Sequence, residues 1–126
     1  MAEPVLRGCR VLVVEDEYLL ADDLSLALSS AGAEVLGPVP SVEEAIATIV
    51  SEQKIDLAVL DVNLRGDMVF PVADALMERG IPFAFATGYD RDALPDRFTT
   101  VPRFEKPFKA HGVAAILVPL IATVKD

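Results

Sequence analysis

Short, nearly continuous apolar runs alternate along this chain with segments whose apolar residues recur at a helical spacing. The runs are three to five residues long and most are bounded by Gly, Pro or charged residues, a pattern typical of strands buried on both faces of a parallel sheet. Strands are therefore predicted at Val11–Val14, Glu34–Leu36, Leu57–Leu60, Pro82–Ala86 and Val101–Phe104. The second of these is expected to end at Gly37-Pro38.

The helical segments between the runs carry recognisable start and stop signals. Gly32 is placed to end the first helix, Ser41–Glu44 is a capping box, and Pro71 suits a first turn. Helices are predicted at about Leu20–Ala31, after Ser41, at Pro71–Arg79 and at Lys109–Val124. Eighteen residues with two prolines separate Thr87 from Lys106, so we expect only a short or frayed fourth helix around Arg91–Leu94.

This alternation predicts an α/β fold. Right-handed crossovers between parallel strands place helices on both faces of the sheet, and neither a repeat nor a linker interrupts the pattern. We therefore expect one domain over residues 1–126, with a doubly wound, five-stranded, flavodoxin-like parallel sheet.

Polar residues follow four of the predicted strands directly. Glu15 and Asp16 follow the first, Asp61 the third and Thr87 the fourth, and Lys106 comes after the fifth with Glu105 in between. Ligands of open parallel sheets bind beyond the carboxyl ends of the strands, so these side chains are predicted to meet at one edge. Three carboxylates, a hydroxyl and an ammonium together favour a site for a hard divalent cation and a phosphoryl group.

Composition excludes some functions. The net charge of −9 argues against direct binding to nucleic acid, whose phosphates would be repelled. Cys9 is the single cysteine, which leaves no disulfide framework and no zinc motif. Neither a signal peptide nor an 18-residue apolar span is present, so we expect a cytoplasmic protein without membrane association.

With these residues in this order, the whole chain resembles the receiver domain of bacterial two-component response regulators. The resemblance rests on the acidic pair Glu15 and Asp16, on Asp61, on Thr87 and on the tripeptide Lys106-Pro107-Phe108. The stretch from Phe85 to Tyr89, Phe-Ala-Thr-Gly-Tyr, further resembles the receiver subclass nicknamed FAT GUY.

The resemblance implies a role for each acidic residue. Asp61 would be the phosphoacceptor, and Mg²⁺ (or Mn²⁺) would be held by Asp16, by Asp61 and by the backbone carbonyl of Asn63. Glu15 would complete the metal site by orienting a metal-bound water. A carboxylate that approaches a phosphoryl group is repelled, which is why the cation is needed.

The resemblance also assigns residues to the phosphoryl group and the switch. Lys106 would pair with Asp61 and later with the phosphoryl oxygen, aimed inward by a cis Lys106-Pro107 bond. Thr87 would sense the phosphoryl group together with the N–H of Gly88, while Tyr89 and Asn63 would tune its lifetime.

The expected partners are a histidine kinase or histidine phosphotransfer protein and an unknown downstream protein. Arg103 stands where many receivers carry an aromatic residue three positions before the lysine. We therefore expect the signal to leave through the segment from Gly88 to Thr100, which has few apolar residues. Ala114, Val118 and Ile121 could form a partner or homodimer patch on the last helix.

Two other functions compete with this signalling module, which would catalyse only its own phosphorylation and dephosphorylation. A haloacid-dehalogenase-like phosphatase also uses an aspartate nucleophile, but it needs a second aspartate two residues later, where this chain has Asn63. A degenerate receiver that acts only by binding would lack some acidic or lysine positions, and all are present. Whether the domain stands alone or was part of a larger regulator is left open.

Overall fold

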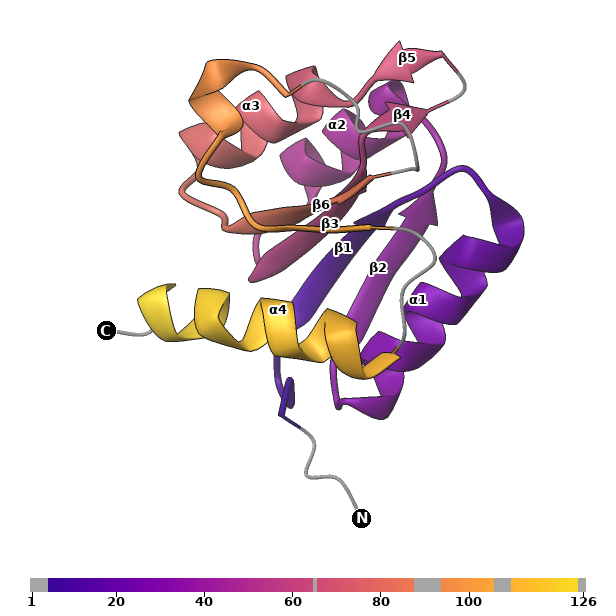
Figure 1. The fold of residues 1–126 in the computed structure, drawn as a ribbon, viewed down its shortest axis with the longest axis vertical. Coiled ribbons are helices and arrows are strands. Elements are labelled where there is room, and N and C mark those ends of the chain that lie inside the picture. Colours follow the sequence, from indigo (N-terminus) through magenta and orange to yellow (C-terminus); the bar gives the residue numbers. More distant parts are fainter. Residues whose placement is uncertain (1–4, 65, 88–93, 106–109, 125–126) are drawn as a thin grey trace.

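A computed structural model describes residues 5–64, 66–87, 94–105 and 110–124, and a five-stranded parallel sheet lies at its centre (Figure 1). The strands are arranged in the order β2-β1-β3-β6-β7. Their bounds are Arg10–Val14 (β1), Glu34–Val39 (β2), Leu57–Asp61 (β3), Phe83–Thr87 (β6) and Arg103–Glu105 (β7). Each of the five predicted apolar runs overlaps one of these strands, so the predicted fold class is confirmed.

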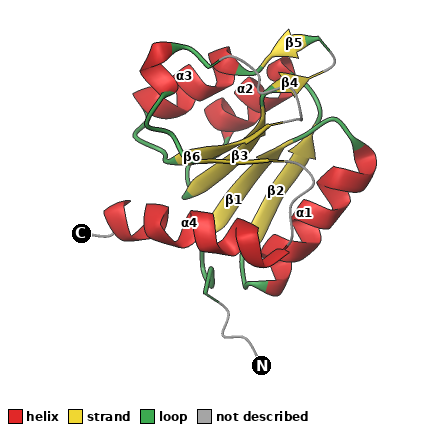
Figure 2. Ribbon diagram, viewed as in Figure 1, coloured by secondary structure: helices red, strands yellow, loops and turns green. Residues whose placement is uncertain are grey.

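Helices cover both faces of this sheet (Figure 2). The helices are α1 (Tyr18–Ser30), α2 (Val42–Ser51), α3 (Phe70–Glu78) and α4 (Ala110–Val124). One core cluster contains Val11 and Val13 with buried residues of α1 and α4, and the other contains Leu12 and Val14 with buried residues of α2 and α3. Alternate residues of β1 thus face opposite layers, and all four are fully buried.

The capping box predicted at the start of α2 is confirmed. The backbone N–H of Glu44 donates to Ser41 Oγ at 3.2 Å, and the Ser41 hydroxyl donates in turn to a carboxylate oxygen of Glu44 at 3.2 Å. The pair satisfies a backbone N–H that the first turn of a helix would otherwise leave unpaired.

Strand β2 runs farther than predicted. Instead of ending at Gly37-Pro38, it continues to Val39, and its pairing with β1 shifts register between Leu12 and Val14. Gly37 has a φ of 96°, which side-chain-bearing residues rarely adopt, so glycine permits this irregularity. Pro38 is tolerated because β2 is an edge strand, where a missing N–H need not break the ladder.

A short hairpin follows β3, in a segment for which no strand was predicted. β4 (Asn63–Leu64) and β5 (Asp67–Met68) pair antiparallel. Gly66 has a φ of 91°, and its N–H donates to Asn63 Oδ1 at 2.8 Å. Two-residue strands are too short for an alternating apolar pattern to reveal them.

The predicted fourth helix, around Arg91–Leu94, lies mostly outside the described residues. Downstream, a 3₁₀ helix spans Asp96–Phe98, and the Phe98 side chain is fully buried. Its ring lies 5.5 Å from that of Phe85 and 5.7 Å from that of Phe70, measured between centroids. An aromatic anchor therefore fills part of the layer beside α3.

Helix α4 contains Pro119 and buries Val113 and Leu117 against the sheet. Val118 is exposed and Ile121 is partly buried against the core, so these two members of the predicted patch differ in accessibility. The side chain of Ala114 lies outside those described, and the homodimer stays a prediction. Among the described residues, no helix combines the length and the apolar character needed to cross a bilayer.

Candidate functional site

The acidic residues lie where two central strands end. Val14 of β1 pairs with Leu60 of β3, so Glu15 and Asp61, the next residues, occupy matching places at the carboxyl edge of the sheet. The Glu15 N–H donates to the carbonyl of Val39 at 3.1 Å, which holds the chain after β1 close to the end of β2. Parallel pairing alone thus brings residues 46 positions apart in the sequence to one site.

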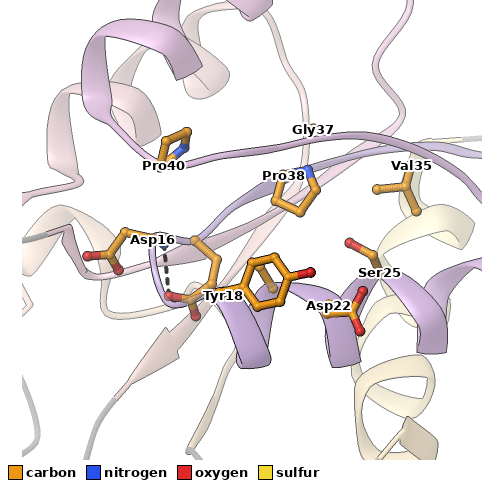
Figure 3. A pocket seen from close by; sticks show the side chains of 10 residues that line it. Asp16, Tyr18, Asp22, Ser25, Val35, Gly37, Pro38 and Pro40 are labelled. Atoms are coloured by element: carbon orange, nitrogen blue, oxygen red, sulfur yellow. Dashed lines mark hydrogen bonds between the residues drawn. The ribbon is translucent and has the colours of Figure 1, made fainter.

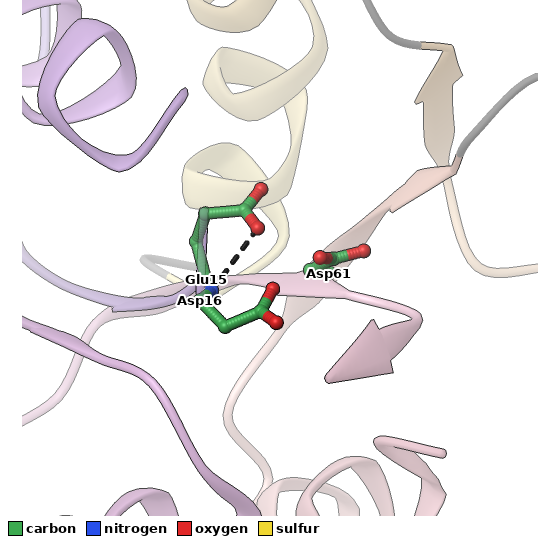
Figure 4. Close-up of side chains that lie close together, drawn as sticks. All are labelled: Glu15, Asp16 and Asp61. Atoms are coloured by element: carbon green, nitrogen blue, oxygen red, sulfur yellow. Dashed lines mark hydrogen bonds between the residues drawn. The ribbon is translucent and has the colours of Figure 1, made fainter. Parts of the chain in front are cut away.

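Three carboxylates converge there, as Figure 4 shows. One carboxylate oxygen from each of Glu15, Asp16 and Asp61 lies within 4.8 Å of the other two. Glu15 and Asp61 are 3% and 6% exposed, and Asp16 is half-buried. The site is therefore recessed on the sheet side and accessible beside Asp16.

Backbone N–H groups orient two of these carboxylates. The N–H groups of Asp16 and Glu17 donate to Glu15 Oε2 at 3.1 and 3.3 Å, and the N–H of Asn63 donates to Asp61 Oδ1 at 3.3 Å. Such bonds fix the direction of a carboxylate. The acidic side chains are thus held in place by the loops that follow β1 and β3.

The donor set fits a hard divalent cation. Oxygen ligands from carboxylates are those that Mg²⁺ prefers, and Mg²⁺ commonly uses one or two carboxylates and leaves other positions to water and phosphate oxygens. Three crowded carboxylates repel each other until positive charge arrives. Glu15, Asp16 and Asp61, all predicted as metal residues, therefore form a cluster that could hold such an ion.

Asn63, also predicted to bind the metal, contributes differently from the acids. Its side-chain oxygen accepts from the Gly66 N–H in the β4–β5 hairpin, and its own N–H donates to Asp61. Asn63 thereby links the hairpin to the acidic cluster. The role predicted for its backbone carbonyl is untested.

Thr87 is the last residue of β6 and is 3% exposed. Asp61 pairs with Ala86, so Thr87 lies one residue farther toward the same edge. Thr87 itself pairs with Glu105 of β7, the residue that precedes Lys106 in the chain. Gly88, Tyr89 and Lys106, and with them the predicted cis Lys106-Pro107 bond, lie outside the described residues.

Arg103 and Phe104 occupy opposite faces of β7, as the alternation of a strand requires. Phe104 is buried with Val113 and Leu117 of α4, whereas Arg103 is exposed.

Sequence reasoning missed two features near the site, the hairpin that carries Asn63 and the anchoring of the 3₁₀ helix by Phe98. The hairpin could have been predicted from Asn63 and Gly66, which are three residues apart and are residue types typical of a turn. No periodic signal marked Phe98, because it stands alone in a segment of polar residues and prolines.

Comparison with known proteins places this geometry in a family. SdrG from Sphingomonas melonis Fr1 is 43% identical, with 90% of this chain and 96% of that chain covered and a TM-score of 0.81. A response regulator receiver protein from Sinorhizobium medicae WSM419 is 25% identical, with 93% and 97% covered and a TM-score of 0.75. The chain belongs to the receiver domain family of response regulators.

Two further comparisons bear on this receiver. A BeF3-activated conformation of SdrG is 42% identical, with 96% and 99% of the two chains covered and a TM-score of 0.75. The sensory transduction protein LytT from Bacillus anthracis is 38% identical over 88 residues, which cover 68% of this chain but only 35% of LytT. The receiver thus matches about a third of that relative's length. No protein-family model matches the chain.

Proposed function

We propose that this receiver accepts a phosphoryl group on Asp61 in the presence of Mg²⁺ (or Mn²⁺). The donor is a phosphohistidine of a histidine kinase or a histidine phosphotransfer protein, and the product alters contacts with a downstream protein. The observation that carries the proposal is the convergence of the Glu15, Asp16 and Asp61 carboxylates within 4.8 Å at the carboxyl edge of the sheet.

The proposed step uses Asp61 as a nucleophile. A carboxylate oxygen attacks phosphorus, the bond between phosphorus and the imidazole nitrogen breaks, and the imidazole leaves with the electron pair and takes up a proton. Asp16 and Asp61, with the carbonyl of Asn63, would hold the cation, which supplies positive charge against the phosphoryl oxygens. Glu15 is fixed by two backbone N–H groups and would orient a metal-bound water.

Lys106 and Thr87 complete the proposed site. Lys106 would supply an ammonium that pairs with Asp61 before transfer and with a phosphoryl oxygen afterwards. The Thr87 hydroxyl can donate to a phosphoryl oxygen, as can the N–H of Gly88, and Tyr89 would stand beside them and affect the lifetime of the acyl phosphate. Support comes from SdrG, which has a BeF3-activated conformation, since this fluoride is a chemical analogue of a phosphoryl group.

The proposed output segment runs from Gly88 to Thr100. Residues 94–100 of this segment are described by the structure. They contact β6, the strand that contains Thr87, because the Phe98 ring packs against Phe85, two residues before Thr87. Arg97 makes two hydrogen bonds to the Asp74 carboxylate of α3, at 2.9 and 3.0 Å, and these raise the pKa of the Arg97 guanidinium. A shift of Thr87 would therefore reach the surface through the 3₁₀ helix.

A signalling module explains the site better than the two alternatives. A haloacid-dehalogenase-like phosphatase needs an acid two residues after its nucleophile, and the amide of Asn63 cannot give up or take a proton as a carboxylic acid does. Its oxygen already accepts from Gly66. A receiver that only binds partners would have no need for three carboxylates that repel each other. We therefore propose no external substrate beyond the phosphodonor.

The test compares wild type with Asp61→Asn and with Asp67→Asn, a matched control because Asp67 is exposed in the neighbouring hairpin. Each protein is incubated with acetyl phosphate and Mg²⁺ and its intact mass is followed, with a chelator added in a parallel sample. We expect one added phosphoryl group in wild type and Asp67→Asn, and none in Asp61→Asn or with the chelator. A gain of mass that persists in Asp61→Asn overturns the proposal.

A further inference from the structure

A groove beside the acidic cluster is lined by both acidic and apolar side chains. It lies between α1 and β2 and has a volume of about 480 Å³. Asp16, Asp22 and Ser25 supply polar groups, and Ala21, Val35 and Pro38 supply apolar surface. Figure 3 shows Asp22 and Ser25 on α1 facing Pro38 and Val35 of β2. We call this feature the α1–β2 groove.

Charge is distributed unevenly along the chain, and the groove lies in the negative part. Residues 11–53 contain nine aspartates and glutamates and no lysine, arginine or histidine, while acidic and basic residues are equal in number in the remainder. The whole net charge of −9 thus belongs to residues 11–53. Arg10, just before this stretch, pairs with Glu34 and Glu52 but not with Asp22 of the groove, so a cation near the groove is attracted.

Two polar groups of the groove could each make a further interaction with a ligand. Among the described residues, Asp22 makes no ion pair, and the buried Ser25 hydroxyl oxygen has no hydrogen-bond partner. A buried hydroxyl without a partner costs free energy that a donor entering the groove would recover. An occupant with several N–H donors would satisfy both groups.

An arginine side chain is complementary to this groove in both its apolar and its charged parts. Its three methylene groups can lie along apolar surface such as Ala21, Val35 and Pro38 while its charged end stays polar. Its guanidinium carries five N–H donors in a planar fork suited to carboxylates. We propose that the α1–β2 groove binds an arginine side chain from a basic segment of a partner protein.

This inference goes beyond the proposed phosphotransfer and does not depend on it. Asp16 lines the groove and also belongs to the acidic cluster, so a substitution there would disturb both sites. Asp22 lines the groove and is not part of the cluster. The test therefore uses Asp22 and the unphosphorylated protein without added metal.

The probe is a synthetic peptide, acetyl-Leu-Arg-Leu-Arg-Leu-amide, and its analogue with citrulline in place of both arginines. Each is titrated into isotope-labelled protein, and backbone amide signals are followed by NMR. We expect saturable shifts at Ala21, Asp22, Ser25 and Val35, and an affinity for the citrulline peptide lower by about tenfold or more, since charge-assisted hydrogen bonds are lost.

A matched pair of variants separates groove binding from general attraction. Asp22→Asn and Asp23→Asn remove the same charge from adjacent exposed positions of α1, but only Asp22 lines the groove. We expect Asp22→Asn to weaken peptide binding by about tenfold, and Asp23→Asn by no more than about twofold, as for an exposed, screened charge.

Three results would overturn the inference. Equal weakening by the two variants, or shifts spread over Glu43 and Glu44 of α2, would show attraction to a negative surface only. Free arginine amide binding as tightly as the peptide would indicate a small-molecule site instead of a docking site.

Discussion

Thr87 lies one residue beyond the strand position that pairs with Asp61, because Asp61 of β3 is opposite Ala86 of β6. The proposed acceptor and the proposed sensor are therefore on neighbouring strands, and the sensor is the residue from which the chain leaves the sheet. A new charge on Asp61 would therefore act first at this end of β6.

The first prediction concerns this pair. Replacing Thr87 by Ala removes a hydroxyl but leaves Asp61 in place, so phosphorylation should persist while the switch fails. In wild type, Mg²⁺ with beryllofluoride should slow amide hydrogen exchange at Phe98, Thr99 and Val101, whose N–H groups donate within the 3₁₀ segment. A charge-assisted hydrogen bond is worth about 1.5–3 kcal/mol, enough for a slowing of tenfold or more.

The Thr87→Ala protein should lose this slowing, and Thr87→Ser, which keeps the hydroxyl, should retain most of it. Exchange in wild type that does not change at saturating beryllofluoride would contradict the proposed output segment. Equal slowing in Thr87→Ala would instead remove Thr87 from the mechanism.

The second prediction concerns the acidic cluster. Asp16→Asn relieves repulsion among three carboxylates within 4.8 Å, so the metal-free protein should become more stable, while stabilisation by Mg²⁺ should be lost. In wild type, Mg²⁺ at a hundred times its dissociation constant should add about 2.7 kcal/mol to the free energy of unfolding. Thermal unfolding with and without Mg²⁺ measures both effects.

Asp23→Asn is the control for this experiment, because Asp23 is exposed on α1 and carries the same charge. It should keep the full Mg²⁺ effect. If Asp16→Asn responded to Mg²⁺ as wild type does, the cluster would not be the metal site.

The third prediction concerns the aromatic anchor. Phe98 is fully buried, and the centroid of its ring lies within 6.2 Å of the ring centroids of Phe70, Phe83 and Phe85. Phe98→Ala should lower the free energy of unfolding by about 3–5 kcal/mol, as expected for truncation of a core phenylalanine. Urea denaturation followed by circular dichroism gives the value.

Phe98→Leu retains most of the apolar volume and should cost clearly less than Phe98→Ala. A loss below about 1 kcal/mol for Phe98→Ala, which is typical of a surface site, would show that the 3₁₀ helix is not anchored through this ring in solution.

The fourth prediction compares two glycines with similar backbone angles. Gly37 and Gly66 have φ values of 96° and 91°, so alanine at either position should cost about 1–2 kcal/mol through the left-handed backbone. At Gly37 a Cβ atom would also lie 2.9 Å from the Val13 carbonyl oxygen and 2.7 Å from the Val39 nitrogen, whereas at Gly66 it would meet nothing within 4 Å.

Gly37→Ala should therefore be the more destabilising of the two, by about 1–3 kcal/mol, the usual cost of overpacking. Chemical denaturation of both variants measures the difference. Equal losses of stability would mean that the end of β2 moves freely enough to accept the methyl group.

Much of the fold follows from local pattern. The apolar runs at Val11–Val14 and Leu57–Leu60 lie in central strands because residues buried on both faces must be apolar at every position. The N-cap of α2 at Ser41 could be predicted directly from the sequence, since all its contacts are within four residues. The irregular end of β2 could not, because it depends on how β2 pairs with β1.

The sequence by itself determined the order along the chain of the five sheet strands and of helices α1 to α4, and it determined which polar residues end the strands. Only the tertiary structure decided that one oxygen from each of Glu15, Asp16 and Asp61 lies within 4.8 Å of the others, since this distance depends on the pairing of β1 with β3. The tertiary structure also decided that Phe98 packs against Phe70, Phe83 and Phe85. These contacts join segments that are separated in the chain, and a linear pattern of apolar and polar residues carries no information about such contacts.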